Sequence, residues 1–127
     1  KFDYIHVAVP TSKVLEYRRR CLEILQKHSV HPIEIGFWVR PEFFSIAMRK
    51  PIGEKPVKAS KDISIALHEM LSLAQDFQGS MEYCHGVGLR LANLMSQEHG
   101  VGLDIMRTIK KAMDPKQILN PGKLGLV

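Results

Sequence analysis

The clearest structural signal in this chain is the stretch IEIGFWVRPEFFSIAMR, residues 33–49. Apolar side chains occupy every second position on both sides of its middle: Ile33, Ile35 and Phe37, then Phe44, Ile46 and Met48. A period of two is typical of strands that bury one face. Arg40 and Pro41 interrupt the pattern and indicate a turn. The stretch therefore predicts an antiparallel β-hairpin.

Further elements are expected on both sides of the hairpin. Residues 2–9 alternate and predict a strand, while residues 14–25 show apolar side chains at helical spacing. Residues 63–77 carry a longer apolar stripe of the same helical period, and Ser60 is placed to cap that helix. Residues 80–83 can form a short fourth strand. The order β-α-β-β-α-β predicts a ferredoxin-like antiparallel sheet, so the expected fold class is α+β with a C-terminal helical extension.

The last third of the chain differs in character. A glycine-rich turn at residues 86–88 precedes an expected helix over residues 89–97, and another helix is expected over residues 103–113. An irregular tail follows. Because the preceding elements already complete a two-layer domain, these helices need a further surface to pack against. We expect a boundary between residues 1–84 and residues 85–127.

Composition restricts the class of protein. With 127 residues, 45% of them hydrophobic and 24% charged, the chain resembles one ordinary globular domain. No apolar run is long enough to cross a membrane, so no transmembrane segment is expected. The net charge of +5 is dispersed, apart from residues 18–20 beside acidic residues, and predicts no nucleic-acid partner. The two cysteines form no disulfide framework, which favours a reducing, cytoplasmic setting.

Four motifs in the last third carry a resemblance to a known family. They are Gly-Ser at residues 79–80, His-Gly-Val-Gly at residues 85–88, Asp-Pro at residues 114–115 and Asn-Pro-Gly-Lys at residues 120–123. In this order they resemble the C-terminus of FAD-linked oxidases of the vanillyl-alcohol oxidase superfamily. The D-lactate dehydrogenase and glycolate oxidase D-subunit group looks most similar. The resemblance is specific over residues 79–124 and rests on element order before that.

The resemblance implies an enzyme, an FAD-dependent oxidoreductase that dehydrogenates a 2-hydroxy acid of the D-lactate or glycolate type. Residues 1–84 would be the ferredoxin-like half of its cap domain, and residues 85–127 would pack on its FAD-binding domain. We expect that domain to lie outside this chain, because the chain opens on Lys1 and has no nucleotide-binding glycine motif in the right context. The fragment alone is then expected to be inactive and to bind FAD weakly.

The resemblance also assigns residues around the flavin. His85 corresponds to the active-site histidine, which accepts the hydroxyl proton or binds the developing alkoxide. A second His-Gly-Val-Gly turn begins at His99. The number of residues between His99 and the Asn-Pro-Gly-Lys tail does not match the spacing in the family, whereas the spacing from His85 does. Gly86, Gly88 and Asn120 are, together with His85, the expected cofactor contacts.

Several 2-hydroxy-acid members are similar in carrying a divalent metal, held by two hairpin histidines and the glutamate before the active-site histidine. The corresponding positions here are Phe37, Phe44 and Cys84. A phenyl ring cannot ligate a metal, and one thiolate alone cannot hold zinc. No metal is therefore expected, and the substrate carboxylate needs another partner.

The remaining site residues are expected on the substrate side. Arg40 on the hairpin is the candidate cation for the carboxylate, with a solvated turn arginine as the alternative. Glu82 and Tyr83 precede the motif, and one of the two is expected to face the substrate. Tyr83 would donate a hydrogen bond or act as acid or base, as a tyrosine does in the related ether-lipid synthase branch.

Two other functions remain open. A free-standing ferredoxin-like module that binds a ligand or partner would explain residues 1–84 but not the tail. One subunit of a split flavoenzyme, with FAD on a partner polypeptide, would explain both parts. The identity of the substrate, the electron acceptor and the formation of a homo-oligomer are left open by the sequence.

Overall fold

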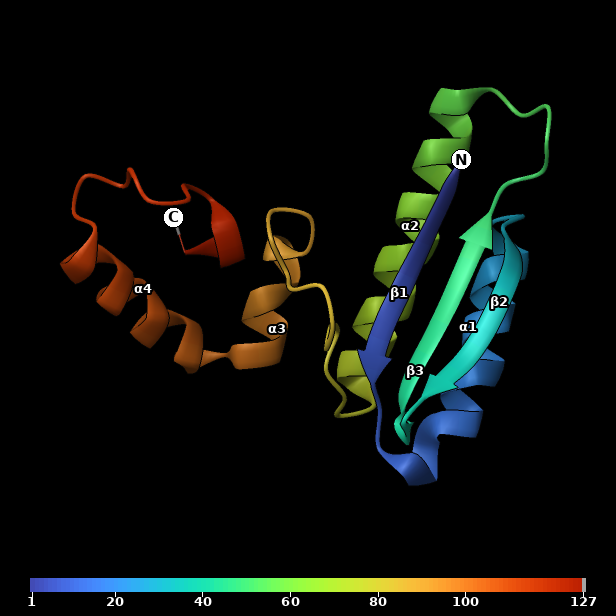
Figure 1. The fold of residues 1–127 in the computed structure, drawn as a ribbon, viewed down its shortest axis with the longest axis horizontal. Helices are drawn as coiled ribbons and strands as arrows, with labels where there is room; N and C mark the ends of the chain where they lie inside the picture. Colours follow the sequence, from blue (N-terminus) through green and yellow to red (C-terminus); the bar gives the residue numbers. More distant parts are fainter. Residues whose placement is uncertain (127) are drawn as a thin grey trace. The chain divides into compact units, whose positions relative to one another are not determined.

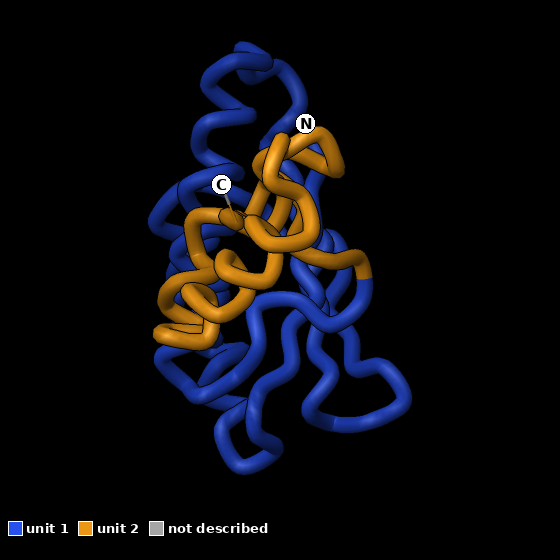
Figure 2. The backbone as a smooth tube through the Cα atoms, turned by 90° about the vertical axis from the view of Figure 1, so that its left-hand side faces the viewer, with its two compact units in different colours: residues 1–84 blue, residues 85–127 orange. Residues whose placement is uncertain are grey.

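The chain folds into two compact units. The computed structural model describes residues 1–126 and divides the chain into unit 1, Lys1–Cys84, and unit 2, His85–Val127 (Figure 2). Among the described residues, the strands all belong to unit 1, and both units contain helices (Figure 1). The expected α+β fold class is confirmed. No helix in residues 1–126 has the length and apolar character needed to span a membrane.

Unit 1 is built on a three-stranded antiparallel sheet. Its strands are β1 (Phe2–Ala8), β2 (His31–Trp38) and β3 (Arg40–Arg49), in the order β1-β3-β2. The central strand β3 pairs with both neighbours, so that Ile46 lies opposite Ile5 on one side and Ile35 on the other. The predicted hairpin of β2 and β3 is thereby confirmed.

The turn of this hairpin lies at Val39, one residue before the predicted position. Val39 has φ +59°, while Arg40 and Pro41 already belong to β3. A β-branched residue with positive φ is rare, and no turn signal in the sequence marks such a residue. The pattern therefore pointed to the neighbouring proline instead.

Two helices cover one face of the sheet and enclose the core. Helices α1 (Val14–Lys27) and α2 (Pro56–Asp76) both lie behind the sheet in Figure 1. The core is formed by fully buried side chains from the sheet and both helices, among them Ile5, Phe44, Ile46, Tyr17, Leu25, Ile63, Leu67 and Met70. The buried hydroxyl of Tyr17 donates a hydrogen bond to the carbonyl of Met70 at 2.9 Å, so its burial leaves no unpaired polar group.

Helix α2 begins at Pro56, earlier than the cap predicted at Ser60. Proline suits the first turn because its missing N–H would have no helical partner there. At the other end, Gln78 has φ +64°, and the Gly79 N–H donates to the Ala74 carbonyl at 2.8 Å. This is a Schellman-type end. A Cβ on Gly79 would lie 2.3 Å from the Ala8 carbonyl oxygen, so only glycine lets the chain pass this close to β1.

The predicted fourth strand at residues 80–83 is reduced to an isolated bridge. Ser80 and Ala8 exchange two backbone hydrogen bonds of 2.7 and 3.1 Å, and the Tyr83 N–H donates to the His6 carbonyl at 3.3 Å. The Ser80 hydroxyl also donates to the Glu82 carbonyl at 3.1 Å. Such local bonds compete with a strand ladder. The segment still runs antiparallel along the outer edge of β1, which is where the fourth strand of a ferredoxin-like sheet belongs.

Unit 2 is a small helical unit. A short 3-10 turn, Ala92–Leu94, leads into α3 (Met95–His99), and α4 (Val101–Met113) follows. The helix predicted over residues 89–97 is therefore shorter than expected, because Gly86 and Gly88 have positive φ and the chain first turns. The helix predicted over residues 103–113 is confirmed as α4. The buried apolar side chains of this unit are Leu91, Leu94, Met95 and Leu103.

Candidate active site

The open face of the sheet, opposite α1 and α2, carries Tyr83. The ring of Tyr83 stacks on Phe43, with ring centroids 4.5 Å apart and the planes inclined by 13°. The ring also meets His6 in an edge-to-face contact at 5.9 Å. Because His6 alternates with the buried side chains of β1, these rings stand on the face that the helices leave open. The backbone bond from Tyr83 to His6 holds the tyrosine beside this strand.

Burial raises the pKa of Tyr83, and the neighbouring Cys84 and Glu82 raise the pKa further through the negative charge that they carry when ionised. A phenol with a raised pKa stays protonated at neutral pH. Among the roles expected for Tyr83, the raised pKa therefore disfavours that of a base and is compatible with a hydrogen-bond donor or an acid.

Glu82 shapes the chain directly before His85. Its carboxylate accepts a hydrogen bond from the Cys84 backbone N–H at 2.7 Å. Cys84 is exposed, whereas Cys21 is fully buried, and no disulfide joins them. Burial raises the pKa of Cys21 to about 12, so this thiol is an inert part of the core.

Arg40 lies at the start of β3, at the tip of the hairpin. It lines a depression of about 420 Å³ together with Val14 and Leu15, where α1 begins, and with Phe37, Val39 and Pro41. Its guanidinium is mostly exposed and lies 3.6 Å from the carboxylate of Glu42. Arg40 thus borders the helix side of the hairpin, and the structure does not bring it onto the open face that carries Tyr83.

Phe37 and Phe44 lie directly opposite each other on β2 and β3. Their ring centroids are 5.4 Å apart, and Phe44 is fully buried with its ring edge-to-face against Tyr17. Both positions that correspond to metal ligands in the family therefore belong to the helix-facing side of the hairpin. Residues 1–126 contain no group of three or more His, Cys, Asp or Glu side chains that could hold a metal ion.

Unit 2 holds the glycine turn and the tail together. Gly86 and Gly88 have φ of +77° and +57°, and a Cβ on either would meet nothing within 4 Å. The space on the Cβ side of both glycines is therefore open, and His85 beside Gly86 is exposed. The Leu124 N–H donates to the Gly88 carbonyl at 3.0 Å, which brings the end of the tail back to the turn.

A buried carboxylate shapes the tail that carries Asn120. Asp114 is 4% exposed and accepts hydrogen bonds from the backbone N–H groups of Ile118 and Leu119, each at 3.0 Å. Lys110 forms an ion pair with Asp114 and also donates to the Leu119 carbonyl. The bond from Lys110, followed by the two backbone bonds, holds the pKa of Asp114 below its usual value. Asn120 follows in an exposed position with φ +47°.

The structure thus groups the expected residues by unit. Tyr83 and Glu82 lie at the end of unit 1, whereas His85, Gly86, Gly88 and Asn120 belong to unit 2. Sequence reasoning missed the aromatic neighbours of Tyr83, although Tyr4 and His6 already alternated with buried positions. It also gave no role to Asp114, whose Asp-Pro motif was the available signal.

Comparison with known proteins places these motifs in context. Residues 3–124 match a family described as FAD linked oxidases, C-terminal domain. The chain is 30% identical over 119 residues to a mitochondrial D-lactate dehydrogenase [cytochrome] of Arabidopsis thaliana, a match that covers 93% of this chain and 20% of that protein. It is 28% identical over 122 residues to a D-lactate dehydrogenase of Archaeoglobus fulgidus, with 96% and 26% covered.

A shorter match concerns a different kind of protein. Over 48 residues the chain is 44% identical to an alkyldihydroxyacetonephosphate synthase of Trypanosoma brucei brucei, which covers 37% of this chain and 8% of that protein. The chain spans about a quarter or less of the length of each of these three relatives.

Proposed function

Because the chain belongs to the family of C-terminal domains of FAD-linked oxidases, we propose that it is the substrate-side part of an FAD-dependent dehydrogenase for 2-hydroxy acids. The family match over residues 3–124 carries this proposal, and the similarity to D-lactate dehydrogenases supports acids of the D-lactate or glycolate type. In this role the chain supplies His85 and the wall that covers the substrate.

The glycine turn suits contact with a flat cofactor ring. Gly86 and Gly88 present backbone that no Cβ shields, so a ring can approach their peptide groups closely. We propose that His85, Gly86, Gly88 and Asn120 contact the flavin. Bound FAD would accept the hydride from the substrate carbon.

His85 and Tyr83 are the groups that we propose for proton transfer and orientation. The exposed imidazole of His85 would take the hydroxyl proton of the substrate as general base. Tyr83, kept protonated by its raised pKa, would donate a hydrogen bond to the substrate. Glu82 would hold the residues before His85 in place through its bond to the Cys84 N–H.

Arg40, which stands at the tip of the hairpin and outside the open face that carries Tyr83, is the cation that we propose for a substrate carboxylate extending past that tip. Its guanidinium lies 3.6 Å from the carboxylate of Glu42. An exposed ion pair of this kind contributes little free energy, so it does not fix the guanidinium beside Glu42. A guanidinium matches a carboxylate in geometry and charge. Arg40→Gln should therefore raise KM more than it lowers kcat, and an unchanged KM would remove Arg40 from the site.

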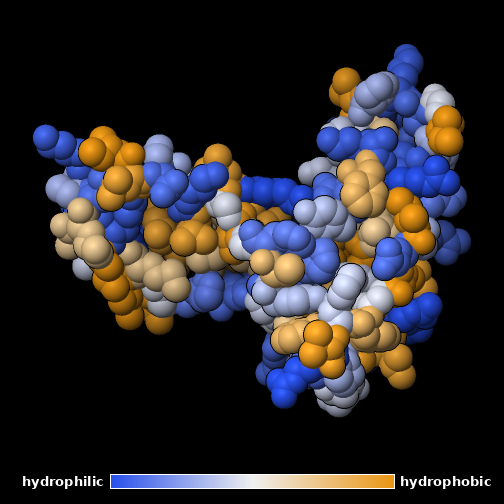
Figure 3. Space-filling model, viewed as in Figure 1, coloured by the Kyte–Doolittle hydropathy of each residue, from blue (hydrophilic) through white to orange (hydrophobic). Residues whose placement is uncertain are grey.

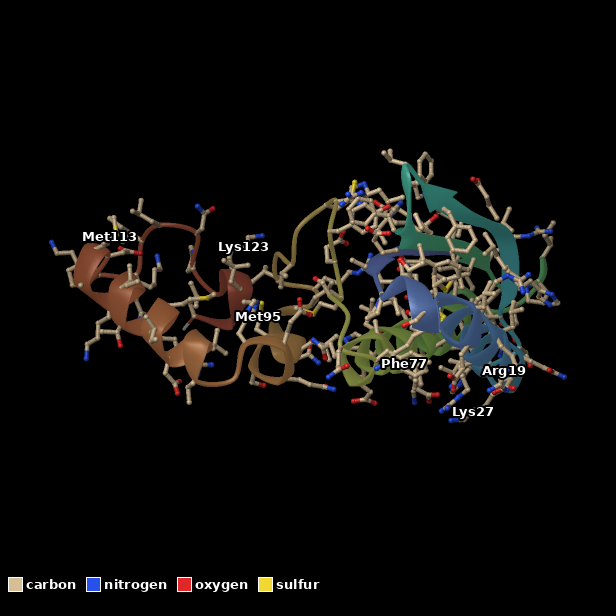
Figure 4. All side chains as sticks on the ribbon, turned by 90° about the horizontal axis from the view of Figure 1, so that it is seen from below. Arg19, Lys27, Phe77, Met95, Met113 and Lys123 are labelled. Carbon is tan, nitrogen blue, oxygen red and sulfur yellow. The ribbon has the colours of Figure 1, made fainter. Side chains whose placement is uncertain are left out.

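The apolar surface of unit 2 supports packing on an FAD-binding domain. Exposed apolar side chains line α4 and the following segment: Val101, Ile105, Ile109, Met113, Ile118 and Leu119. Hydrophobic atoms gather along the lower edge of α4 in Figure 3, and Figure 4 places Met113 at the end of this helix and Lys123 in the tail. A contiguous apolar surface of this kind marks an interaction site. We propose that the FAD-binding domain of the same or a partner polypeptide covers it, and that the 127-residue chain alone binds FAD weakly.

The direct test uses the longest native polypeptide that contains this segment. Its visible absorption spectrum should show bound flavin, and anaerobic addition of D-lactate, glycolate or a larger D-2-hydroxy acid should bleach it. His85→Ala should retain the flavin but slow the bleaching about 10²- to 10⁴-fold, the usual contribution of a general base. His99→Ala is the matched control, because His99 is also exposed and also precedes Gly-Val-Gly.

Each result has a definite meaning. Equal effects of the two histidine substitutions would remove His85 from catalysis. A flavin that no 2-hydroxy acid reduces would reject the proposed substrate class. We also propose a cytoplasmic location, since both cysteines are thiols, and cell fractionation tests it.

A further inference from the structure

A connected series of aromatic rings covers the open face of the sheet. The contacts run along β1 from Phe2 to Tyr4 at 6.0 Å and on to His6 at 5.1 Å. From His6 the series continues to Trp38 on β2 at 6.4 Å and to Tyr83 at 5.9 Å. These distances fit the edge-to-face and tilted arrangements that aromatic rings prefer. From Tyr83, the proposed hydrogen-bond donor, the series continues to Phe43 on β3 at 4.5 Å.

Between these rings the sheet surface is hollowed. The depression has a volume of about 170 Å³ and is lined by Phe2, Tyr4, His6, Glu34, Trp38, Ser45, Ile46 and Ala47. The indole N–H of Trp38 donates to the Ser45 hydroxyl at 2.7 Å, which holds one wall in a fixed orientation. The space is small beside typical binding sites for whole drug-sized ligands, which measure about 300–1,000 Å³. It suits a single side chain.

The stability of the fold does not explain why aromatic rings lie on the open face of the sheet. The core of unit 1 lies on the opposite face and is closed by α1 and α2. Phe2 and Trp38 remain 54% and 48% exposed, so much of their apolar surface stays in water. Exposed aromatic surface of this extent is characteristic of binding surfaces.

We propose that the depression binds an aromatic ring of the substrate, so that the substrate is a 2-hydroxy acid with an aryl side chain. This inference rests on the proposed function and specifies its substrate class. The ring would lie among Phe2, Tyr4 and Trp38, in the edge-to-face or offset contacts that the existing rings already make. The methyl group of lactate would leave most of this surface uncovered.

The negative charge of Glu34 at the depression determines the orientation in which such a substrate can bind. Glu34 is the carboxylate in its lining and is exposed, so it repels a substrate carboxylate at this position. The apolar ring therefore occupies the depression, and the hydroxy-acid end points away from Glu34. His6 contacts both Trp38 and Tyr83 and so connects the depression with the proposed donor.

A fluorescence titration tests this proposal without any flavin. Trp38 is the only tryptophan of the chain, so its emission reports on the depression alone. Adding D-3-phenyllactate to the 127-residue chain, shown to be folded by circular dichroism, should change the emission saturably. The same concentrations of D-lactate should not. Tyr4→Ala should weaken phenyllactate binding about tenfold, which corresponds to the upper end of the energy of an aromatic pair.

A matched control and a second measurement complete the test. Phe37→Leu removes a ring that is as exposed as Trp38 but borders the helix side of the hairpin, and it should leave phenyllactate binding unchanged. In the longest native flavoprotein, kcat/KM for D-3-phenyllactate should exceed that for D-lactate, and Tyr4→Ala should reduce this ratio.

The outcomes separate this inference from the proposed function. Equal responses to lactate and phenyllactate, or a Tyr4→Ala variant that binds as tightly as the unaltered chain, would overturn the aryl site. If D-lactate bleaches the flavin in that case, the proposed function stands. Phenyllactate that binds beside Trp38 but never bleaches the flavin would also overturn this inference, because the ring site would then not hold the oxidised substrate; the proposed function would still be tested by bleaching with D-lactate.

Discussion

The two units of this chain are stabilised in different ways. Of the buried apolar side chains in the described residues, twenty belong to unit 1 and four to unit 2. Unit 1 closes its core between the sheet and two helices. Unit 2 leaves most of the apolar side chains of α4 in solvent, as Ile105, Ile109 and Met113 show.

Unit 2 has a small apolar core, and polar contacts fix much of its conformation. Asp114 and Lys110 fix the start of the tail, and the guanidinium of Arg107 donates to the Gly125 carbonyl at 3.0 and 3.2 Å. Such bonds define a conformation but contribute modestly to its stability. Burial of apolar side chains therefore stabilises unit 1 more than unit 2, and we propose that another domain covers the apolar side chains exposed on α4.

The largest expected effect concerns the core of unit 1. Phe44→Ala should lower the free energy of unfolding by about 3–5 kcal/mol, because it removes a fully buried ring that contacts Tyr17 and Phe37. Urea denaturation followed by far-UV circular dichroism measures the change. Ile52→Ala, at a side chain that is 91% exposed, should stay within about 0.5 kcal/mol. A loss at Phe44 no larger than at Ile52 would contradict the assignment of Phe44 to the core that stabilises unit 1.

A smaller and local effect is expected from acid on unit 2. The folded pKa of Asp114 is lowered, so its stabilisation of the tail is complete above the unfolded value of about 3.9 and is lost as pH falls through the folded value. The NMR signals of the Ile118 and Leu119 amides, which donate to Asp114, should shift in this range. In Asp114→Asn one of the two amides should lose its acceptor at every pH, and neither should show the acid transition, because the side-chain amide keeps a single acceptor oxygen and does not titrate. The same acid transition in the variant would show that another group controls the tail.

The smallest effect on the chain itself is expected at the exposed face of α4. Ile109→Asn should change the free energy of unfolding by less than about 0.5 kcal/mol, since Ile109 is 54% exposed. In the longest native flavoprotein the same substitution should reduce flavin retention several-fold, because it places an amide in the proposed domain contact. Lys111→Asn, on the same helix, should leave flavin retention unchanged. Strong destabilisation of the 127-residue chain by Ile109→Asn would instead mean that unit 2 already buries this residue.

The order of elements and the family were readable from the sequence, because both depend on local patterns. Alternation at Ile33, Ile35 and Phe37 predicts a strand wherever it occurs, and the spacing from His85 to Asn120 requires no knowledge of the fold. The exact ends of the helices and strands were harder to predict from the sequence. Val39 takes positive φ and residues 80–83 form only a bridge, because neighbouring strands and local side-chain bonds decide these points.

The α+β class, the hairpin and the membership in the family of FAD-linked oxidase C-terminal domains follow from local patterns in the sequence. Which side chains meet depends on how the elements pack in the folded chain. The contacts of Phe43 and His6 with Tyr83, and the placement of Arg40 beside α1 instead, arise from strands that are distant in sequence. A pattern with a period of two indicates that successive side chains point to opposite faces of the sheet. Which face the helices cover, and which face stays open for a ligand, depends on long-range packing that no local pattern contains.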